Sequence, residues 1–167
     1  MEMRGLAMFS ILNRQSSPSE ILNSSLLNED TFYGTFIKDL DKCGGEVIIE
    51  SPFITHRRIS QLMPALKKLK ERKVRVVINT RNPQEHEEKY AREDALDSLA
   101  SLQRIGVQVV YTDSHHRKLA ILDRSILYEG SLNILSQNNS REVMRRIESV
   151  RLAWQMARFV EIDRFLS

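Results

Sequence analysis

His115-His116-Arg117-Lys118-Leu-Ala-Ile-Leu-Asp123 is the stretch that decides the fold and the chemistry of this chain. It contains the apolar run of a strand over 118–123, and Arg124-Ser125 separates that run from a second one over 126–129. Because so short a connection cannot contain a crossover helix, the two strands are predicted to form an antiparallel hairpin. Gly130-Ser131-Leu132-Asn133 follows the hairpin, whose geometry returns it to the neighbourhood of His116.

His116 and Lys118 are two positions apart, so on a strand their side chains project from the same face. A histidine and a lysine side by side would each need a partner if they were buried. Facing a groove, they suit an anionic phosphate. The lysine supplies positive charge, and the histidine supplies a nucleophile or a proton donor near neutral pH. Both are therefore candidate catalytic residues.

The other polar residues of the hairpin region divide into a structural and a ligand-facing group. Asp123 has the opposite parity from His116 and lies at the turn, where aspartate accepts hydrogen bonds from backbone donors, so we expect it to be structural. Gly130 lets the backbone come close to a ligand. Ser131 and Asn133 offer neutral hydrogen-bonding groups for phosphate oxygens, and we expect both in the active site.

The spacing of these residues resembles that of the phospholipase D superfamily. That family is marked by His-x-Lys, four residues, Asp, six residues and Gly-Gly/Ser-x-Asn. The chain has His116-x-Lys118, Asp123 and Gly130-Ser131-x-Asn133 at the same intervals. Ile49-Glu50-Ser51-Pro52-Phe53 also resembles the strand-end segment near the start of many such domains. The resemblance covers roughly residues 30–150.

This resemblance implies a two-step displacement through a covalent phosphohistidine, in which one histidine attacks phosphorus and a second protonates the leaving oxygen. Members commonly have a carboxylate past the Asn that orients the imidazole. Ser140-Arg141-Glu142 is similar to that segment, so Glu142 is the candidate orienting residue; the alternative is a surface glutamate at the start of a strand. Because His-x-Lys occurs once in this chain and the mechanism needs two histidines, we expect a homodimer with a composite site.

Outside the hairpin, apolar residues alternate between helical and strand periods. Helices are predicted around Phe32–Leu40, around Ile59–Leu69, over 84–105 with Leu96, Leu99 and Leu102 on one face, and over 150–166, where the aromatic residues should pack in the core. Strands are predicted over 46–50, 74–79, 107–111 and 142–147, besides the hairpin. This order predicts an α/β fold with a mixed, mostly parallel sheet flanked by helices on both faces.

Residues 1–28 are predicted to be an N-terminal arm, and residues 29–167 a single phospholipase D-like domain. Ser, Asn and Pro are frequent in the arm. Ser17-Pro18-Ser19-Glu20 has the N-cap, proline and capping-box pattern that begins a short helix reaching about Leu27. The length of 167 residues is within the usual size of one domain.

The net charge of +3 and the pI of about 9.1 suggest an anionic partner. Eight Lys/Arg residues and one acid lie within 56–75, whereas six acids and two bases lie within 84–97. The basic segment predicts a track for nucleic-acid phosphates; the alternative is an ordinary solvated helix. Arg81 follows a strand, where α/β proteins gather ligand groups. The candidate substrate-binding residues are Arg57, Lys67, Lys68, Lys70 and Arg81.

No metal or other cofactor is predicted. The sequence has a single cysteine, no Cys/His cluster with zinc spacing and no carboxylate cluster that resembles a two-metal site. No apolar run approaches the ~18 residues of a membrane span, and residues 5–12 make a poor signal peptide, so we expect no membrane partner and a cytoplasmic location. A nuclease there must be restrained, which favours a regulatory partner or a fused domain.

Three functions are compatible with these features. The first is a metal-independent nuclease that hydrolyses DNA. The second is a nucleic-acid-binding dimer module of a larger helicase or restriction system, in which the motif is intact but idle. The third is a phospholipid phosphodiesterase. His115 does not fit the register of the motif, and it is expected to be an exposed neighbour, as are His56 and His86.

Overall fold

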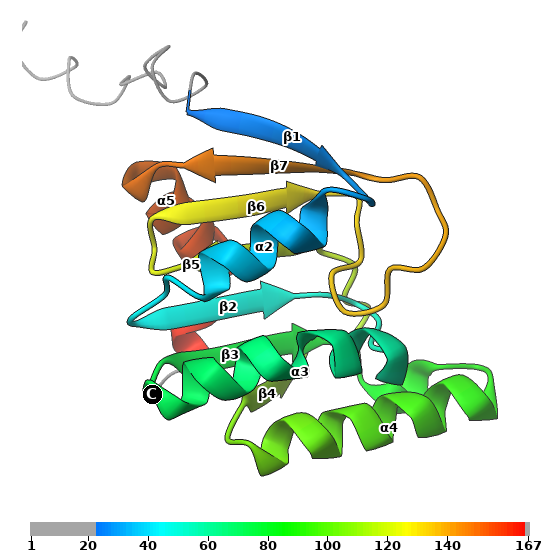
Figure 1. Ribbon diagram of the computed structural model, residues 1–167. Helices are drawn as coiled ribbons and strands as arrows, with labels where there is room; N and C mark the ends of the chain where they lie inside the picture. The colour runs from blue at the N-terminus through cyan, green and yellow to red at the C-terminus, as the bar shows by residue number, and fades with distance from the viewer. Residues whose placement is uncertain (1–22, 166–167) are drawn as a thin grey trace, which may run out of the picture.

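The computed structural model describes residues 23–165, and these form one mixed sheet covered by helices on both faces (Figure 1). The strand order is β1-β7-β6-β5-β2-β3-β4. The strands are β1 (Ser24–Asn28), β2 (Glu46–Glu50), β3 (Arg75–Thr80), β4 (Gln108–Tyr111), β5 (Leu119–Leu122), β6 (Ile126–Gly130) and β7 (Val143–Glu148). The expected α/β fold with helices on both faces is confirmed.

The expectation of a mostly parallel sheet is wrong. Only β2–β3 and β3–β4 pair in parallel, whereas β1–β7, β7–β6, β6–β5 and β5–β2 are antiparallel. The two parallel pairs are those joined by crossover helices, as the sequence pattern indicated. The β5–β6 hairpin lies on the other side of β2, and β5 runs antiparallel to β2. The alternation of helices and strands in the sequence does not reveal this change from parallel to antiparallel pairing.

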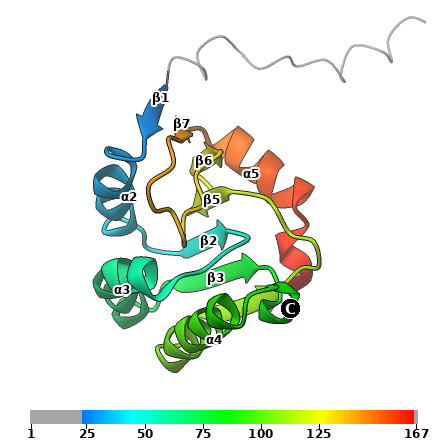
Figure 2. The ribbon, with the colours of Figure 1, turned by 90° about the vertical axis from the view of Figure 1, so that its right-hand side faces the viewer.

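Three helices cover one face, α2 (Phe32–Leu40), α3 (His56–Glu71) and α4 (Lys89–Arg104), and a short 3₁₀ turn, η1 (Pro83–Glu85), precedes the last of them. On the other face lie α5 (Val150–Phe159) and the 3₁₀ turn η2 (Ile162–Phe165), as Figures 1 and 2 show. The predicted 84–105 helix therefore begins late, at Lys89. Its face consists of Ala95, Ser98, Leu99 and Leu102, while Leu96 is exposed.

The sheet separates two apolar cores, because alternate strand residues face opposite sides. Ile49 and Ile78 pack toward α2, α3 and α4 with Phe32, Phe36 and many aliphatic side chains. Ile48 and Val77 pack toward α5, mainly against Ala153, Ala157, Val160 and Ile162. Residues near the ends of β2 and β3 with the parity of Ile48, such as Glu50 and Asn79, therefore lie on the face that α5 covers.

The last residues of the segment expected to be an N-terminal arm belong to the sheet. Ser24–Asn28 form the edge strand β1, which pairs with all but one residue of β7. The helix expected to reach Leu27 is therefore absent from 24–27, because pairing with β7 makes these residues a strand. The rest of that predicted helix lies outside the described residues.

The closing helix buries small residues instead of its aromatic ones. Phe159 is 75% exposed and Trp154 44% exposed, whereas Ala153 and Ala157 are fully buried. The expectation that these aromatic residues fill the core is wrong, because the helix lies so close to the sheet that alanines form the contact. The exposed side chains of α5 are mixed in character: Arg151, Gln155 and Arg158 are exposed as well as Trp154 and Phe159.

Candidate active site

The ends of three inner strands lie side by side at one end of the sheet, the end that faces the viewer in Figure 2. β2 ends there at Glu50, β5 begins there at Leu119, and β6 ends there at Gly130. The segment before β5 carries His116 and Lys118, and the segment after β6 carries Ser131 and Asn133. The antiparallel hairpin thus brings the two halves of the motif together, as its short connection predicted.

His116 and Lys118 precede β5, which begins one residue later than expected, yet their side chains meet. The Lys118 Nζ atom lies 3.0 Å from His116 Nδ1 and donates to the His116 carbonyl oxygen at 2.8 Å. Burial lowers the pKa of Lys118, and nearby Glu142 opposes that effect. The ammonium is therefore easier to deprotonate than an ordinary lysine, and it lies against the imidazole that is the candidate nucleophile.

Glu142 lies beside the serine of the motif. Its carboxylate accepts hydrogen bonds from the hydroxyl groups of Ser131 and, at 2.8 Å, Ser140. Among the hydrogen bonds of residues 23–165, none joins Glu142 to His116. The carboxylate thus belongs to the motif's surroundings, at the Ser131 end of the site.

Asn133 has an amide oxygen that is buried and lacks a hydrogen-bond partner within the described structure. An unpaired buried polar atom costs free energy, and in native proteins such atoms commonly mark a binding or catalytic site. Gly130 of the motif makes a close approach to strand β7 as well as lining the pocket described below. A Cβ atom there would lie 2.2 Å from the Val143 carbonyl oxygen.

A surface pocket of about 540 Å³ brings together His116, Lys118 and Ser131, while Asn133 and Glu142 are not among the residues that line it. Phe159 and Met156 of α5 form its apolar wall. The residues that line it are His116, Arg117, Lys118, Leu119, Glu129, Gly130, Ser131, Met156 and Phe159. A histidine, a lysine and a serine hydroxyl at one pocket mouth can contact a phosphodiester simultaneously, so the arrangement suits nucleophilic attack on phosphorus.

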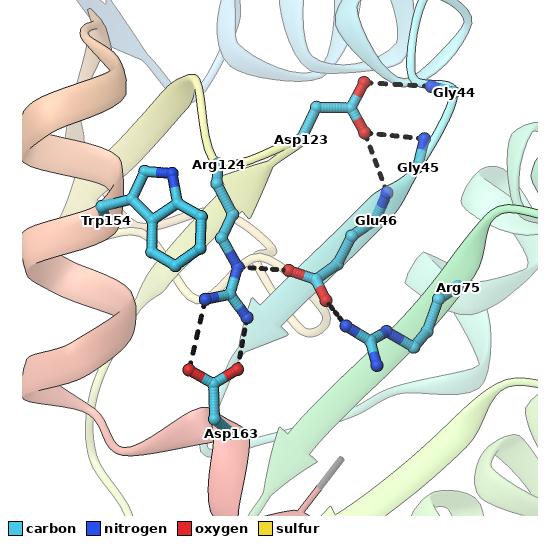
Figure 3. A pocket seen from close by; sticks show the side chains of 8 residues that line it. All are labelled: Gly44, Gly45, Glu46, Arg75, Asp123, Arg124, Trp154 and Asp163. Carbon is cyan, nitrogen blue, oxygen red and sulfur yellow. Dashed lines mark hydrogen bonds and ion pairs between the residues drawn. The ribbon is translucent and has the colours of Figure 1, made fainter. Parts of the chain in front are cut away.

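Asp123 lies at the turn of the hairpin, at the end opposite His116, and Figure 3 shows it beside Gly44, Gly45 and Glu46. Its carboxylate accepts hydrogen bonds from the backbone N–H groups of Gly44, Gly45 and Glu46 at 2.8–3.0 Å. Asp123 and Arg124 both adopt positive φ, at 49° and 48°, which matches the right-handed twist of a tight hairpin. These contacts support the structural role expected for Asp123, far from His116.

Replacing Asp123 with asparagine is expected to lower the free energy of unfolding by about 1–3 kcal/mol, because an amide accepts fewer and weaker hydrogen bonds from the backbone. Burial acts to raise the pKa of Asp123, but the three N–H donors outweigh it and hold the pKa below its usual value. A depressed folded-state pKa stabilises above the unfolded-state pKa. The difference between wild type and variant in urea unfolding should therefore shrink as the pH falls through the depressed value; a constant difference would contradict this origin.

The same end of the sheet holds a charged pocket of about 770 Å³ (Figure 3). Arg124 fills its centre. The guanidinium pairs with Glu46 and Asp163, and it lies 4.4 Å from the centroid of the Trp154 ring. Arg75 pairs with Glu46 from the neighbouring strand. Every charged side chain that lines this pocket has a partner, so the pocket is a structural junction between the hairpin and the C-terminal turn.

The candidate substrate-binding residues are distributed over a long surface. Arg57 lies in the first turn of α3 and donates to Asn138 of the segment that follows the motif. The three lysines lie about 15–20 Å further along the helix, given a rise of 1.5 Å per residue. Lys68 is 3.9 Å from Asp41, and Lys70 donates to the Val74 carbonyl at 3.1 Å. Lys67, Lys68 and Lys70 are therefore near the end of the sheet opposite His116.

Arg81 has internal contacts. Its guanidinium donates to the His115 carbonyl oxygen at 3.2 Å, lies 3.6 Å from Glu85 and covers the Phe53 ring. His115 itself is only 3% exposed, so the expectation that it is an exposed neighbour is wrong. Burial lowers the pKa of His115, which favours the neutral imidazole. His86 is half-buried and packs against Phe53, which corrects the expectation of exposure for it; His56 is exposed as expected.

Two functional candidates were missed in the sequence, Glu50 and Arg117. They form a two-pronged ion pair at the strand edge beside the motif. The signal was present, since an acid ends an otherwise apolar strand and a base occupies the middle of His-x-Lys. It could not be used, because nothing in a single sequence shows that the two segments are neighbours.

Within residues 23–165, no group of three or more His, Cys, Asp or Glu side chains is arranged to hold a metal ion. In the same part of the chain, no helix has the length and apolar character needed to cross a membrane. The groups of the motif that line the pocket are the His116 imidazole, the Lys118 ammonium and the Ser131 hydroxyl.

The sequence matches the family described as "Cardiolipin synthase, PLD-like domain" over residues 36–163. Comparison with curated proteins finds no match. Nuc, a phospholipase D family member from Salmonella typhimurium, has a similar structure, with a TM-score of 0.67 and 17% identity over 85% of this chain and 94% of that one.

Two other solved structures are also similar. NucT from Helicobacter pylori has a TM-score of 0.66 and 20% identity over 83% of this chain and 92% of that one. Phosphatidylserine synthase from Haemophilus influenzae has a TM-score of 0.59 and 17% identity, over 85% of this chain but only 38% of that one. At these identities the structural likeness shows a shared fold.

Proposed function

From the premise that this chain belongs to the phospholipase D superfamily, we propose that it is a phosphodiesterase, and foremost a metal-independent nuclease acting on DNA. The observation that carries the proposal is the contact between His116 and Lys118 in a pocket that Ser131 also lines. Half-buried Lys118 contacts the exposed imidazole of His116. Asn133, two residues after Ser131, has an unpaired buried amide oxygen.

In the proposed reaction, an imidazole nitrogen of one histidine attacks phosphorus, so that a nitrogen–phosphorus bond forms while the bond to the leaving alkoxide breaks. A second histidine donates its proton to the alkoxide. The second histidine then takes a proton from water, whose oxygen displaces the first histidine and releases the phosphate monoester. Lys118, with Ser131 and Asn133, would stabilise the charge on the non-bridging oxygens.

The second histidine would come from a second copy of the chain. His115 is buried and its side chain cannot share the pocket mouth with His116, so one chain supplies one nucleophile. The exposed side of α5 supports this arrangement. Phe159 and Met156 line the pocket of His116 and also an adjacent apolar pocket with Leu127 and Leu152. A partner packed there would bury this surface and bring its own His116 to the same phosphate.

A second candidate, phospholipid hydrolysis, is favoured by that same apolar pocket. Its volume is about 340 Å³, and it shares Glu129, Met156 and Phe159 with the pocket of His116. An acyl chain or a partner subunit could occupy such a surface. The third candidate, a nucleic-acid-binding dimer whose motif is idle, predicts binding without turnover.

One experiment separates the three. The purified chain is incubated with plasmid DNA, with single-stranded RNA, with phosphatidylglycerol vesicles and with bis(4-nitrophenyl) phosphate. The proposal expects nicking or degradation of DNA and release of nitrophenol. Cleavage of the lipid alone would favour the second candidate, and DNA binding without any hydrolysis would favour the third.

Chelation is expected to leave the rate of DNA cleavage unchanged within about twofold, because covalent attack by His116 replaces the hydroxide that a metal would generate. The rate is measured in EDTA and again after magnesium is added. Complete loss in EDTA that magnesium restores would contradict the phosphohistidine route.

Substitution of Lys67, Lys68 and Lys70 by glutamine should flatten the slope of log affinity against log salt for long duplexes, because fewer counterions are released. The separation of about 15–20 Å from Arg57 corresponds to roughly five base pairs. A duplex shorter than that distance should show the wild-type slope, which makes it the matched control. An unchanged slope for the long duplex would leave these lysines as solvated surface.

A further inference from the structure

The motif histidine lies beyond the last pair of the β2–β5 ladder. That ladder ends at Glu50 opposite Leu119, and the residues that precede Leu119 have no strand partner on the β2 side. On the other side, the Gly130 N–H donates to the Lys118 carbonyl at a long 3.4 Å. Backbone pairing therefore does not fix His116, although covalent catalysis needs the imidazole at a defined position.

Beyond the end of this ladder, the side chain of Arg117 connects the segment to β2. Its Nε donates to Glu50 Oε2, and its Nη2 donates to Glu50 Oε1 at 3.1 Å, so that the two planar groups meet in a fork. Glu50 has no exposed surface, and the strand behind it supplies another donor. Asn79 Nδ2 lies 3.0 Å from Glu50 Oε1, while Asn79 Oδ1 accepts from the Thr112 hydroxyl at 3.0 Å.

A second contact holds the residue on the other side of His116. The Arg81 guanidinium donates to the His115 carbonyl, and the His115 side chain is buried. The segment therefore alternates in what holds it: His115 is buried and Arg117 is bound to Glu50, whereas His116 and Lys118 have no such anchor, and all three residues from His116 to Lys118 line the pocket. Both anchors come from the ends of strands, from β2 in the case of Glu50 and directly after β3 in the case of Arg81.

We propose that the Glu50–Arg117 pair is the positioning element of this active site, and that it sets the His116 imidazole and the Lys118 ammonium for attack on phosphorus. The inference rests on the proposed function for its catalytic consequence. Its physical basis is that a buried carboxylate cannot be left without its partner, so the fork keeps Arg117, and with it both neighbours, in one place. Glu50 has no exposed surface and would not touch the substrate, and Arg117, although it lines the pocket, would act by holding the segment in place.

Arg117→Lys tests the proposal, because lysine keeps the charge but has no fork. On bis(4-nitrophenyl) phosphate we expect kcat to fall about 10- to 100-fold with KM changed less than about twofold, since a misplaced nucleophile slows the chemical step more than binding. The matched control is Arg75→Lys, which alters the Glu46–Arg75 pair at the other end of the same strand. The control should keep the wild-type kcat.

The double variant Glu50→Gln/Arg117→Gln guards against a folding defect, because two neutral amides remove both buried charges together. It should unfold at a temperature close to that of wild type and still lose kcat. Arg117→Ala should regain part of its kcat in dilute guanidinium chloride, which Arg75→Ala should not. Wild-type kcat in Arg117→Lys, or a loss that only follows the folded fraction, would overturn the proposal.

Amide hydrogen exchange gives a measurement that does not depend on hydrolysis. In Arg117→Lys the amides of 115–118 should exchange at least about tenfold faster than in wild type, with those of β2 and β3 unchanged. If wild type hydrolyses no phosphodiester, the proposed function fails, but this measurement still shows whether the Glu50–Arg117 pair holds the segment. Unchanged exchange over 115–118 would show that the pair does not hold this segment.

Discussion

Replacing His116 with alanine is expected to reduce phosphodiester hydrolysis at least about a thousandfold, because nothing in the pocket can replace a covalent nucleophile. His115 is adjacent in sequence, but it is 3% exposed and faces inward, so it cannot take over. Binding of the substrate should weaken much less, since Lys118 and Ser131 remain. The measurement is the single-turnover rate on a plasmid or on bis(4-nitrophenyl) phosphate.

The matched control is His56→Ala, which removes an exposed histidine whose ring contacts only Ser60 among the described hydrogen bonds. Its rate should equal that of wild type. Trapping adds a direct observation: a rapid quench in alkaline detergent, in which a nitrogen–phosphorus bond persists, should recover ³²P on the wild-type protein from a labelled substrate, and His116→Ala should give none. Wild-type turnover by His116→Ala would refute the assignment of the site.

The sequence predicts the parts of the site that depend on local geometry. The interval between His116 and Lys118 places both side chains together, and the short connection after Asp123 returns Ser131 to them. Both inferences use distances of a few residues along one hairpin, where strand periodicity and turn length determine the outcome. The same reasoning assigned Asp123 a structural role at the turn, although the backbone donors that it binds belong to Gly44, Gly45 and Glu46, which are 77–79 residues away in the chain.

The sequence does not predict which segments meet across the sheet. His115 is held at its carbonyl by Arg81, which is 34 residues away in the chain, and the partner of Arg117 is 67 residues away. For α5, the helical period was clear, but it is compatible with either face being buried. In the structure the face with Ala153 and Ala157 packs on the sheet, and Phe159 and Trp154 are exposed.

That exposed face leads to the prediction about assembly. A site with two histidines, built from a chain with one usable histidine, needs two copies of His116. Phe159, 75% exposed at the wall of the pocket, is where a second copy would pack. Phe159→Glu should therefore convert the protein to a monomer in sedimentation and lower its activity about as far as His116→Ala does, because each monomer retains half of the site.

Subunit exchange then distinguishes a shared site from two independent ones. If each dimer has one composite site, a heterodimer of wild type and His116→Ala has a single histidine and should be inactive. After exchange reaches equilibrium, wild-type homodimers form in proportion to the square of the wild-type fraction, so total activity should fall as that square. Exchange with His56→Ala in place of His116→Ala should leave activity unchanged at every ratio. A linear fall with His116→Ala would mean that each subunit completes the reaction alone, because a dilution of independent sites reduces activity only in proportion to their number.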